Sequence, residues 1–209
     1  MMQLSERTLG DWLEHWAATT PDKEYIVYSD RNLRFTWKQF NERVDNLAKG
    51  LLSIGVEKGT HVGIWARNVP DWLTFLYACA KIGAVAVTVN TNYKQAELEY
   101  LCQNSDMHTL CIVDGEKDSS FVDMTYTMLP ELKTFQRGHL KSKRFPYMRN
   151  VIYIGQEKYR GMYNTAEILL LGKNIDDEKT GRSQEESKLS RHRNMQYTSG
   201  TTGFPKESC

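Results

Sequence analysis

Residues 61–90 read HVGIWARNVPDWLTFLYACAKIGAVAVTVN and combine two β-branched apolar runs with a helical segment between them. The runs cover residues 61–65 and 84–89. Between them, Asn68 and Pro70 open a segment with apolar residues at helical spacing, Asn serving as N-cap and Pro lying in the first turn. Apolar strands without polar alternation are typical of parallel strands that are buried on both faces. The stretch therefore predicts a strand–helix–strand unit of a parallel sheet.

The chain downstream of this unit continues the alternation. A helix around residues 98–102 leads to a strand at 110–113, and a weaker helical pattern covers 121–132. A strand at 151–154 and a helix at 166–171 follow. Strands that alternate with helices predict an α/β fold, with helices packed on both faces of a mostly parallel sheet and right-handed crossovers.

The chain upstream adds a hairpin and two helices. Apolar residues at helical spacing predict a helix over residues 9–16, and two short strands at 25–28 and 33–35 flank turn residues. Thr36 and Gln39, three residues later, form a capping box. The helix that this box opens has one apolar face from 40 to 52. These elements are expected to lie beside the sheet.

The composition indicates a folded domain with small-molecule partners. The 209 residues are 40% hydrophobic and 25% charged, which supplies a packed core and argues against a disordered chain. The 27 Lys and Arg residues against 26 Asp and Glu leave a formal net charge of +1. This balance gives no global attraction to nucleic acid or to an anionic membrane. We therefore expect small-molecule partners and no nucleic acid.

Membrane and export signals are not expected either. The most apolar stretch, residues 73–89, is short for a bilayer span and divides at Gly83 into a helical half and a β-branched half. The first 16 residues are charged and lack the apolar run of a secretion signal. We expect a cytoplasmic protein without a transmembrane segment. No C-x-x-C pair occurs, so we expect reduced thiols at Cys79, Cys102, Cys111 and Cys209.

A basic segment covers residues 137–149 and contains no acidic residue. One interpretation is a phosphate or nucleic-acid contact, with Phe145 and Tyr147 as stacking side chains. The other is a solvated surface, which the near-neutral net charge favours. The cations are Arg137, Lys141, Lys143, Arg144 and Arg149.

The segment 194–206 concentrates hydroxyl and glycine residues before a lysine. Glycines permit backbone conformations that other residues avoid, and such a loop turns N–H groups and hydroxyls toward one anion. A lysine adds a mobile positive charge that suits a polyphosphate. The chain contains neither G-x-x-x-x-G-K-[ST] nor G-x-G-x-x-G, and composition alone also fits an ordinary turn. The candidate phosphate-binding residues are Thr198, Ser199, Gly200, Thr201, Thr202, Gly203 and Lys206.

Residues 197–206, YTSGTTGFPK, closely resemble the phosphate-binding signature of the adenylate-forming (AMP-binding) superfamily, which includes acyl-CoA synthetases, luciferases and peptide-synthetase adenylation domains. The resemblance is nearest to the fatty-acyl-CoA synthetases and covers most of residues 9–115 and 194–206. It implies an α/β fold equivalent to the N-terminal part of an acyl-CoA synthetase large domain. Further matching segments are residues 35–37, 59–64, 81–85 and 90–93.

The resemblance implies a two-step acid–thiol ligase that uses ATP, Mg²⁺ and coenzyme A on a carboxylic acid such as a fatty acid. The carboxylate attacks the α-phosphate of ATP to give an acyl-adenylate and pyrophosphate, and the thiol of coenzyme A then displaces AMP. By the same resemblance, the seven candidate residues would bind the nucleotide and hold the departing pyrophosphate. None of them is a proton-transfer residue, so no catalytic residue and no metal ligand is expected among them.

The sequence departs from the family pattern around this loop. Glu207 places a negative charge next to the lysine, which works against anion binding. Polar residues 190–193 stand where the family has a short apolar strand, and family members are more than twice as long. We therefore expect residues 1–172 to form the N-terminal α/β region, 173–193 a polar linker and 194–209 a truncated phosphate-binding loop segment.

These departures also bear on activity. We expect this chain to be incomplete and inactive by itself, with the ligase function inherited from the family. One alternative is a non-enzymatic truncated binding or interaction module. A second is a phosphate-binding domain of another α/β type that stands alone.

Overall fold

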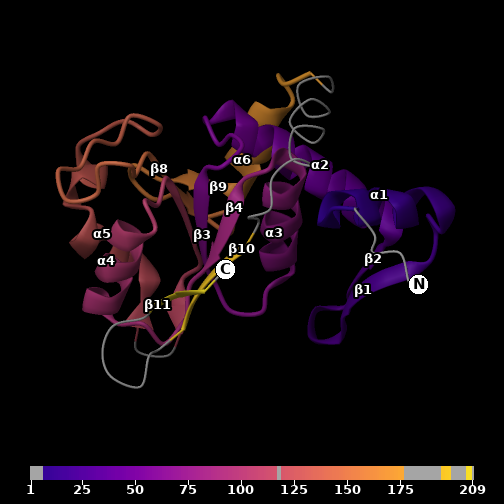
Figure 1. Ribbon diagram of the computed structural model, residues 1–209, viewed down its shortest axis with the longest axis horizontal. Helices are drawn as coiled ribbons and strands as arrows, with labels where there is room; N and C mark the ends of the chain where they lie inside the picture. The colour runs from indigo at the N-terminus through magenta and orange to yellow at the C-terminus, as the bar shows by residue number, and fades with distance from the viewer. Residues whose placement is uncertain (1–6, 117–118, 177–193, 199–205, 209) are drawn as a thin grey trace.

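The two β-branched runs form neighbouring parallel strands, β3 (His61–Trp65) and β4 (Val85–Thr88), in the central sheet. Figure 1 shows this sheet in the computed structural model, which describes residues 7–116, 119–176, 194–198 and 206–208. Val62 and Val87 are fully buried, as expected of strands that are covered on both faces. The other strands of the sheet are β5 (Thr109–Ile112), β8 (Asn150–Tyr153), β9 (Tyr163–Asn164), β10 (Asn194–Thr198) and β11 (Lys206–Ser208).

The sheet is mostly parallel, as predicted. Within the described residues it has seven strands in the order β11-β10-β4-β3-β5-β8-β9. Neighbouring strands are parallel except for β10 and β11. The chain passes from β3 to β4 on one side and then to β5 on the other side of β3. In open α/β sheets, ligands bind beyond the carboxyl ends of the strands near such a reversal.

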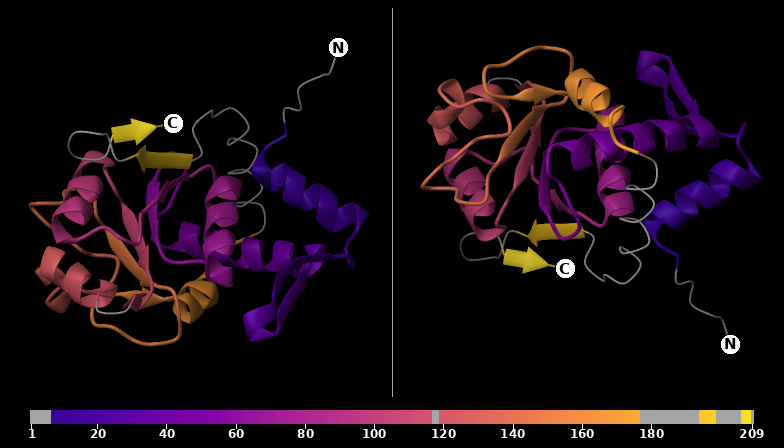
Figure 2. Two further views of the ribbon diagram at one scale, coloured as in Figure 1. Left: turned by 90° about the horizontal axis from the view of Figure 1, so that it is seen from below. Right: turned by 90° about the horizontal axis from the view of Figure 1, so that it is seen from above.

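Helices cover both faces of the sheet (Figures 1 and 2). One face carries α2 (Trp37–Ser53), α3 (Pro70–Ile82) and α6 (Thr165–Gly172). The other face carries α4 (Gln95–Asn104) and α5 (Phe121–Met128). The predicted α/β architecture is therefore confirmed.

An N-terminal arm lies beside the sheet at one end of the molecule (Figure 1). It consists of α1 (Leu9–Thr19), β1 (Glu24–Tyr28), the 3₁₀ turn η1 (Ser29–Arg31) and β2 (Leu33–Thr36). The strands β1 and β2 pair antiparallel, which confirms the predicted hairpin. The capping box that begins α2 is also confirmed, because Thr36 and Gln39 exchange both of their side-chain-to-backbone hydrogen bonds.

A buried lysine joins the arm to the sheet-covering helices. The Lys81 side chain on α3 is 1% exposed, and its Nζ donates to Glu14 Oε1 at 3.0 Å. It also donates to Asn41 Oδ1 at 2.8 Å and to the carboxylate of Asp45. Glu14 belongs to α1, whereas Asn41 and Asp45 belong to α2. One charged group therefore connects three helices.

Two element boundaries differ from the prediction. The N-cap of α3 is Val69, which makes no side-chain cap hydrogen bond, so the assignment of this role to Asn68 was wrong. The helical pattern over 121–132 is interrupted at Leu129, because Pro130 cannot donate a hydrogen bond to the preceding turn. A 3₁₀ turn, η2 (Pro130–Lys133), follows. A short hairpin of β6 (Gly115–Glu116) and β7 (Ser119–Ser120) was not predicted.

Cys79, Cys102 and Cys111 are free and buried, as expected of thiols in apolar settings. Burial raises the pKa of the Cys79 thiol to about 12. In the part of the chain that the structure describes, no helix is long and apolar enough to cross a membrane. Most of the predicted linker, residues 177–193, and Cys209 lie outside the described residues.

Candidate functional site

The candidate phosphate-binding segment leaves the sheet at the carboxyl ends of its parallel strands. In the register of β10 and β4, Gln196 pairs with Thr88, the last residue of β4. Because the two strands run parallel, Thr198 lies beyond the end of β4 at the same edge of the sheet. This is the edge at which α/β proteins bind their ligands.

A strand hairpin brings the two ends of the candidate loop together. β10 and β11 pair antiparallel, and Thr198 is the register partner of Lys206. Tyr197 pairs in the same way with Glu207, so the backbone of the acidic residue is part of this hairpin. The structure thus juxtaposes the first and last of the seven predicted residues. The other five lie outside the described residues: Ser199, Gly200, Thr201, Thr202 and Gly203.

The residue types at this position suit a nucleotide polyphosphate. Hydroxyl and glycine residues followed by a lysine carry N–H, O–H and ammonium donors, the groups that bind a phosphate anion. Among the described residues, no group of three or more His, Cys, Asp or Glu side chains is placed to bind a metal ion.

The turn after β4 begins where β4 ends beside β10, at the carboxyl ends of the strands. Asn90 Oδ1 accepts a hydrogen bond from the backbone N–H of Asn92 at 2.9 Å, which fixes the turn locally. The N–H of Tyr93 donates to the carbonyl of Asn90 at 3.1 Å. Burial, assisted by the Glu97 carboxylate, raises the pKa of Tyr93, so its hydroxyl stays protonated. The turn after β4 is thus fixed by two hydrogen bonds, and its Tyr93 side chain is uncharged.

Sequence reasoning missed a polar pair that also lies at the carboxyl ends of the parallel strands. The Tyr153 hydroxyl, at the end of β8, donates to Asp114 Oδ1, just after β5. Burial and the adjacent Asp114 carboxylate raise the pKa of Tyr153. The ring of Tyr159 meets that of Tyr153 edge-on with centroids 4.8 Å apart. Both partners of the pair follow from one rule, because each stands at the carboxyl end of a predicted strand.

The basic segment 137–149 is engaged mostly within the protein. Arg137 pairs with Glu167, and Arg144 pairs with Glu99. Phe145 is buried and cannot stack on a base, whereas Tyr147 is exposed. These contacts favour the interpretation of the segment as a protein surface rather than a nucleic-acid site.

Comparison with known proteins assigns the family. The model of the family described as AMP-binding enzyme matches residues 13–207. The chain belongs to the AMP-binding enzyme family. The predicted resemblance is therefore confirmed over nearly the whole chain.

Relatives within the AMP-binding family are acyl-CoA synthetases by name. The chain is 44% identical over 206 residues to the inferred acyl-CoA synthetase YngI of Bacillus subtilis (strain 168), covering 99% of this chain and 38% of the relative. It is 33% identical over 217 residues to the mitochondrial medium-chain acyl-CoA ligase ACSF2 of Bos taurus, covering 98% of this chain and 33% of the relative. The chain thus spans 38% and 33% of the length of these two relatives.

A solved structure of an AMP-binding enzyme shows the same fold. The anthranilate CoA ligase AuaEII, in complex with anthranoyl-AMP, superposes with a TM-score of 0.70 and 19% identity. The match covers 99% of this chain and 36% of that one. At this identity the likeness supports the fold.

Proposed function

We propose that this chain is the part of an ATP-dependent acid–thiol ligase that holds the departing pyrophosphate. The observation that carries the proposal is the register of the β10–β11 hairpin. It pairs Thr198 with Lys206 at the carboxyl edge of the sheet, so that the hydroxyl- and glycine-rich loop between them is anchored at both ends. Membership of the AMP-binding family and the names of the relatives support the same function.

The proposed reaction joins a small carboxylic acid, such as a fatty acid, to coenzyme A. A carboxylate oxygen forms a bond to the α-phosphorus of ATP, and the bond from that phosphorus to the bridging oxygen of pyrophosphate breaks. The thiol sulfur of coenzyme A then attacks the acyl carbon, and AMP leaves. Mg²⁺, which family members use, would neutralise phosphate charge.

This chain's part is electrostatic. Backbone N–H groups and hydroxyls of the loop would orient the β- and γ-phosphates, and Lys206 would stabilise the negative charge that develops as pyrophosphate leaves. We assign no proton transfer to these residues. The expected compartment is the cytoplasm, although the name of the bovine relative places that protein in mitochondria.

The proposal can be tested in a chimera. Residues 1–209 replace the matching 38% of YngI, and acyl-CoA formation from a fatty acid, ATP, Mg²⁺ and coenzyme A is measured. We expect a rate within about tenfold of YngI, which is roughly 1.4 kcal/mol in barrier height. We expect residues 1–209 alone to release no AMP, because they match only about a third of the length of the relatives.

The two possible failures have different meanings. A chimera that folds but forms no acyl-CoA would contradict the ligase function and favour the non-enzymatic binding module. Fatty-acid-dependent AMP release by residues 1–209 alone would instead show that this chain is a sufficient catalyst, against our expectation. Circular dichroism and size-exclusion chromatography establish that each protein is folded before rates are compared.

A further inference from the structure

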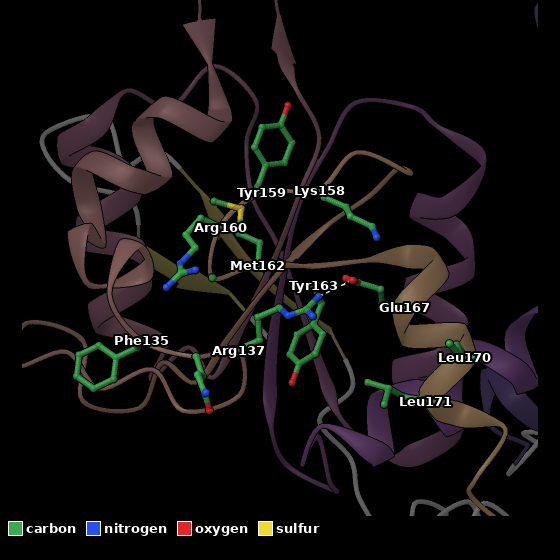
Figure 3. Close-up of a pocket in the computed structure, with 12 residues that line it drawn as sticks. Phe135, Arg137, Lys158, Tyr159, Arg160, Met162, Tyr163, Glu167, Leu170 and Leu171 are labelled. Atoms are coloured by element: carbon green, nitrogen blue, oxygen red, sulfur yellow. Dashed lines mark ion pairs between the residues drawn. The ribbon is translucent and has the colours of Figure 1, made fainter.

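A cavity of about 910 Å³ opens beside β9, at the opposite edge of the sheet from β10. Three segments enclose it: the residues after η2, the loop from β8 to β9, and α6 (Figure 3). Small-molecule sites have volumes of about 300–1,000 Å³. We call this space the β9-edge cavity, and its principal lining residues are Phe135, Arg137, Lys158, Arg160, Glu167 and Leu170.

The β9-edge cavity is positively charged. Its lining contains the cations Arg137, Lys158 and Arg160 and one carboxylate, Glu167, so three positive charges face one negative charge. Glu167 is already engaged by the ion pair with Arg137. In the part of the chain that the structure describes, the side chains of Lys158 and Arg160 form no ion pair or hydrogen bond. Both remain available to an anion from outside.

Contacts within the fold hold Arg137 and Glu167 in place at the cavity. The guanidinium of Arg137 lies 5.4 Å from the ring centroid of Tyr163 while it pairs with Glu167. Glu167 also accepts the backbone N–H of Asn164 at 3.0 Å as part of the cap of α6. Although burial raises the pKa of Glu167, these hydrogen bonds outweigh it and lower the pKa, so the carboxylate stays charged. Arg137 and Glu167 are therefore fixed before any ligand arrives, and the exposed Lys158 and Arg160 side chains adjust to it.

Apolar side chains complete the lining. Leu170 is 62% exposed and Phe135 is 36% exposed, so both side chains offer apolar surface to a ligand. In the view of Figure 3, Phe135 lies to one side of Arg137, and Leu170 and Leu171 lie to the other. Charged and apolar surfaces thus adjoin within one concave space.

We propose that the β9-edge cavity binds a small amphiphilic anion, a molecule with a carboxylate or phosphate group and an apolar chain. The anionic group pairs with Lys158 and Arg160. The apolar part covers the exposed side chains of Leu170 and Phe135. A cationic amphiphile would meet a net repulsion, and a neutral one would gain no attraction from the charges of Lys158 and Arg160. The concave shape selects a single molecule rather than a flat bilayer surface. This site is independent of the proposed phosphate loop, because the two lie at opposite edges of the sheet.

The test compares two probes of equal chain length and opposite charge. Decyl phosphate and decyltrimethylammonium, both below their micelle concentrations, are titrated into the 209-residue chain by isothermal titration calorimetry. We expect saturable binding of decyl phosphate and none of the ammonium compound. The double variant Lys158→Glu/Arg160→Glu should weaken decyl phosphate binding about tenfold or more, because attraction is replaced by repulsion.

A matched control separates the site from overall charge. Lys38→Glu/Lys143→Glu changes the net charge by the same amount at exposed positions that do not line the cavity, and it should shift the affinity by less than about twofold. Leu170→Ser tests the apolar contact and should weaken decyl phosphate binding while leaving that of inorganic phosphate unchanged.

Three results would overturn the proposal. They are equal binding of the two probes, equal loss in the control and cavity variants, and binding to phosphatidylglycerol vesicles without binding of monomeric decyl phosphate. Circular dichroism confirms that each variant is folded, so a loss of binding reports on the cavity.

Discussion

Lys81 shows how one residue stabilises the arm against the sheet. Its ammonium is 1% exposed and has three oxygen partners, on Glu14, Asn41 and Asp45. The Glu14 and Asp45 side chains are 45% and 34% exposed, so water partly solvates their charges when Lys81 is removed, and the loss is smaller than for a fully buried ion pair. We predict that Lys81→Ala lowers the free energy of unfolding by about 1–3 kcal/mol, measured by urea denaturation. The exposed Lys38→Ala control should stay within about 0.5 kcal/mol.

The stability that Lys81→Ala loses should depend on pH in a definite direction. Burial raises the pKa of Asp45, and Lys81 lowers it. Without Lys81, the pKa of Asp45 in the folded chain lies further above its unfolded value, so the folded state favours the protonated acid. Stability from such a group is lost as the pH rises through the folded pKa. The deficit of Lys81→Ala should therefore be largest near pH 7 and shrink toward about pH 4, and a deficit that grows on acidification would contradict this account.

At the scale of elements, the crossing of α2 and α6 depends on a glycine. A Cβ on Gly50 would lie 2.5 Å from both Cγ2 and the carbonyl oxygen of Ile168. Alanine favours a helix over glycine by about 1 kcal/mol, but overpacking at this contact costs about 1–3 kcal/mol. We predict that Gly50→Ala lowers the free energy of unfolding by about 1–2 kcal/mol in urea. Glu42→Ala, on the exposed face of the same helix, should have little effect, and a more stable Gly50→Ala would show that the crossing is not tight.

Most elements could be predicted because burial imposes a period on the sequence. The apolar positions of α2, from Phe40 to Leu52, are buried, and the β-branched runs became central strands. The prediction failed where local signals compete. Asn68 is a good capping residue one position too early, and Pro130 breaks a pattern that is periodic on both sides.

The candidate site was predictable in its chemistry but not in its surroundings. The loop residues follow from their types and order, whereas the pairing of β10 with β4 joins segments more than a hundred residues apart. The sequence carries no local signal for such a contact. The strand β10 was also not predicted; it begins at Asn194, directly after the polar residues 190–193. The cavity beside β9 depends on three segments between residues 135 and 171 that come together only in the fold.

On the scale of the whole molecule, the two candidate ligand sites lie on opposite sides of the sheet. The side of the sheet with β10 and β11 carries the hairpin at the ends of the candidate phosphate loop, and the side with β9 carries a basic, partly apolar cavity. The central strands and the helices on both faces hold these edges apart (Figure 2). Ligand binding at one edge can therefore be tested without altering the other.

The most direct test of the central claim is the exchange of labelled pyrophosphate into ATP. It is measured in the chimera that joins residues 1–209 to the remainder of YngI, with a fatty acid present and coenzyme A left out. This half-reaction requires pyrophosphate to be held and returned, which is the role proposed for the loop. We predict that Lys206→Ala lowers the exchange rate about 100-fold or more, while Lys38→Ala leaves it unchanged. An exchange rate in Lys206→Ala equal to that of the parent chimera would contradict the account.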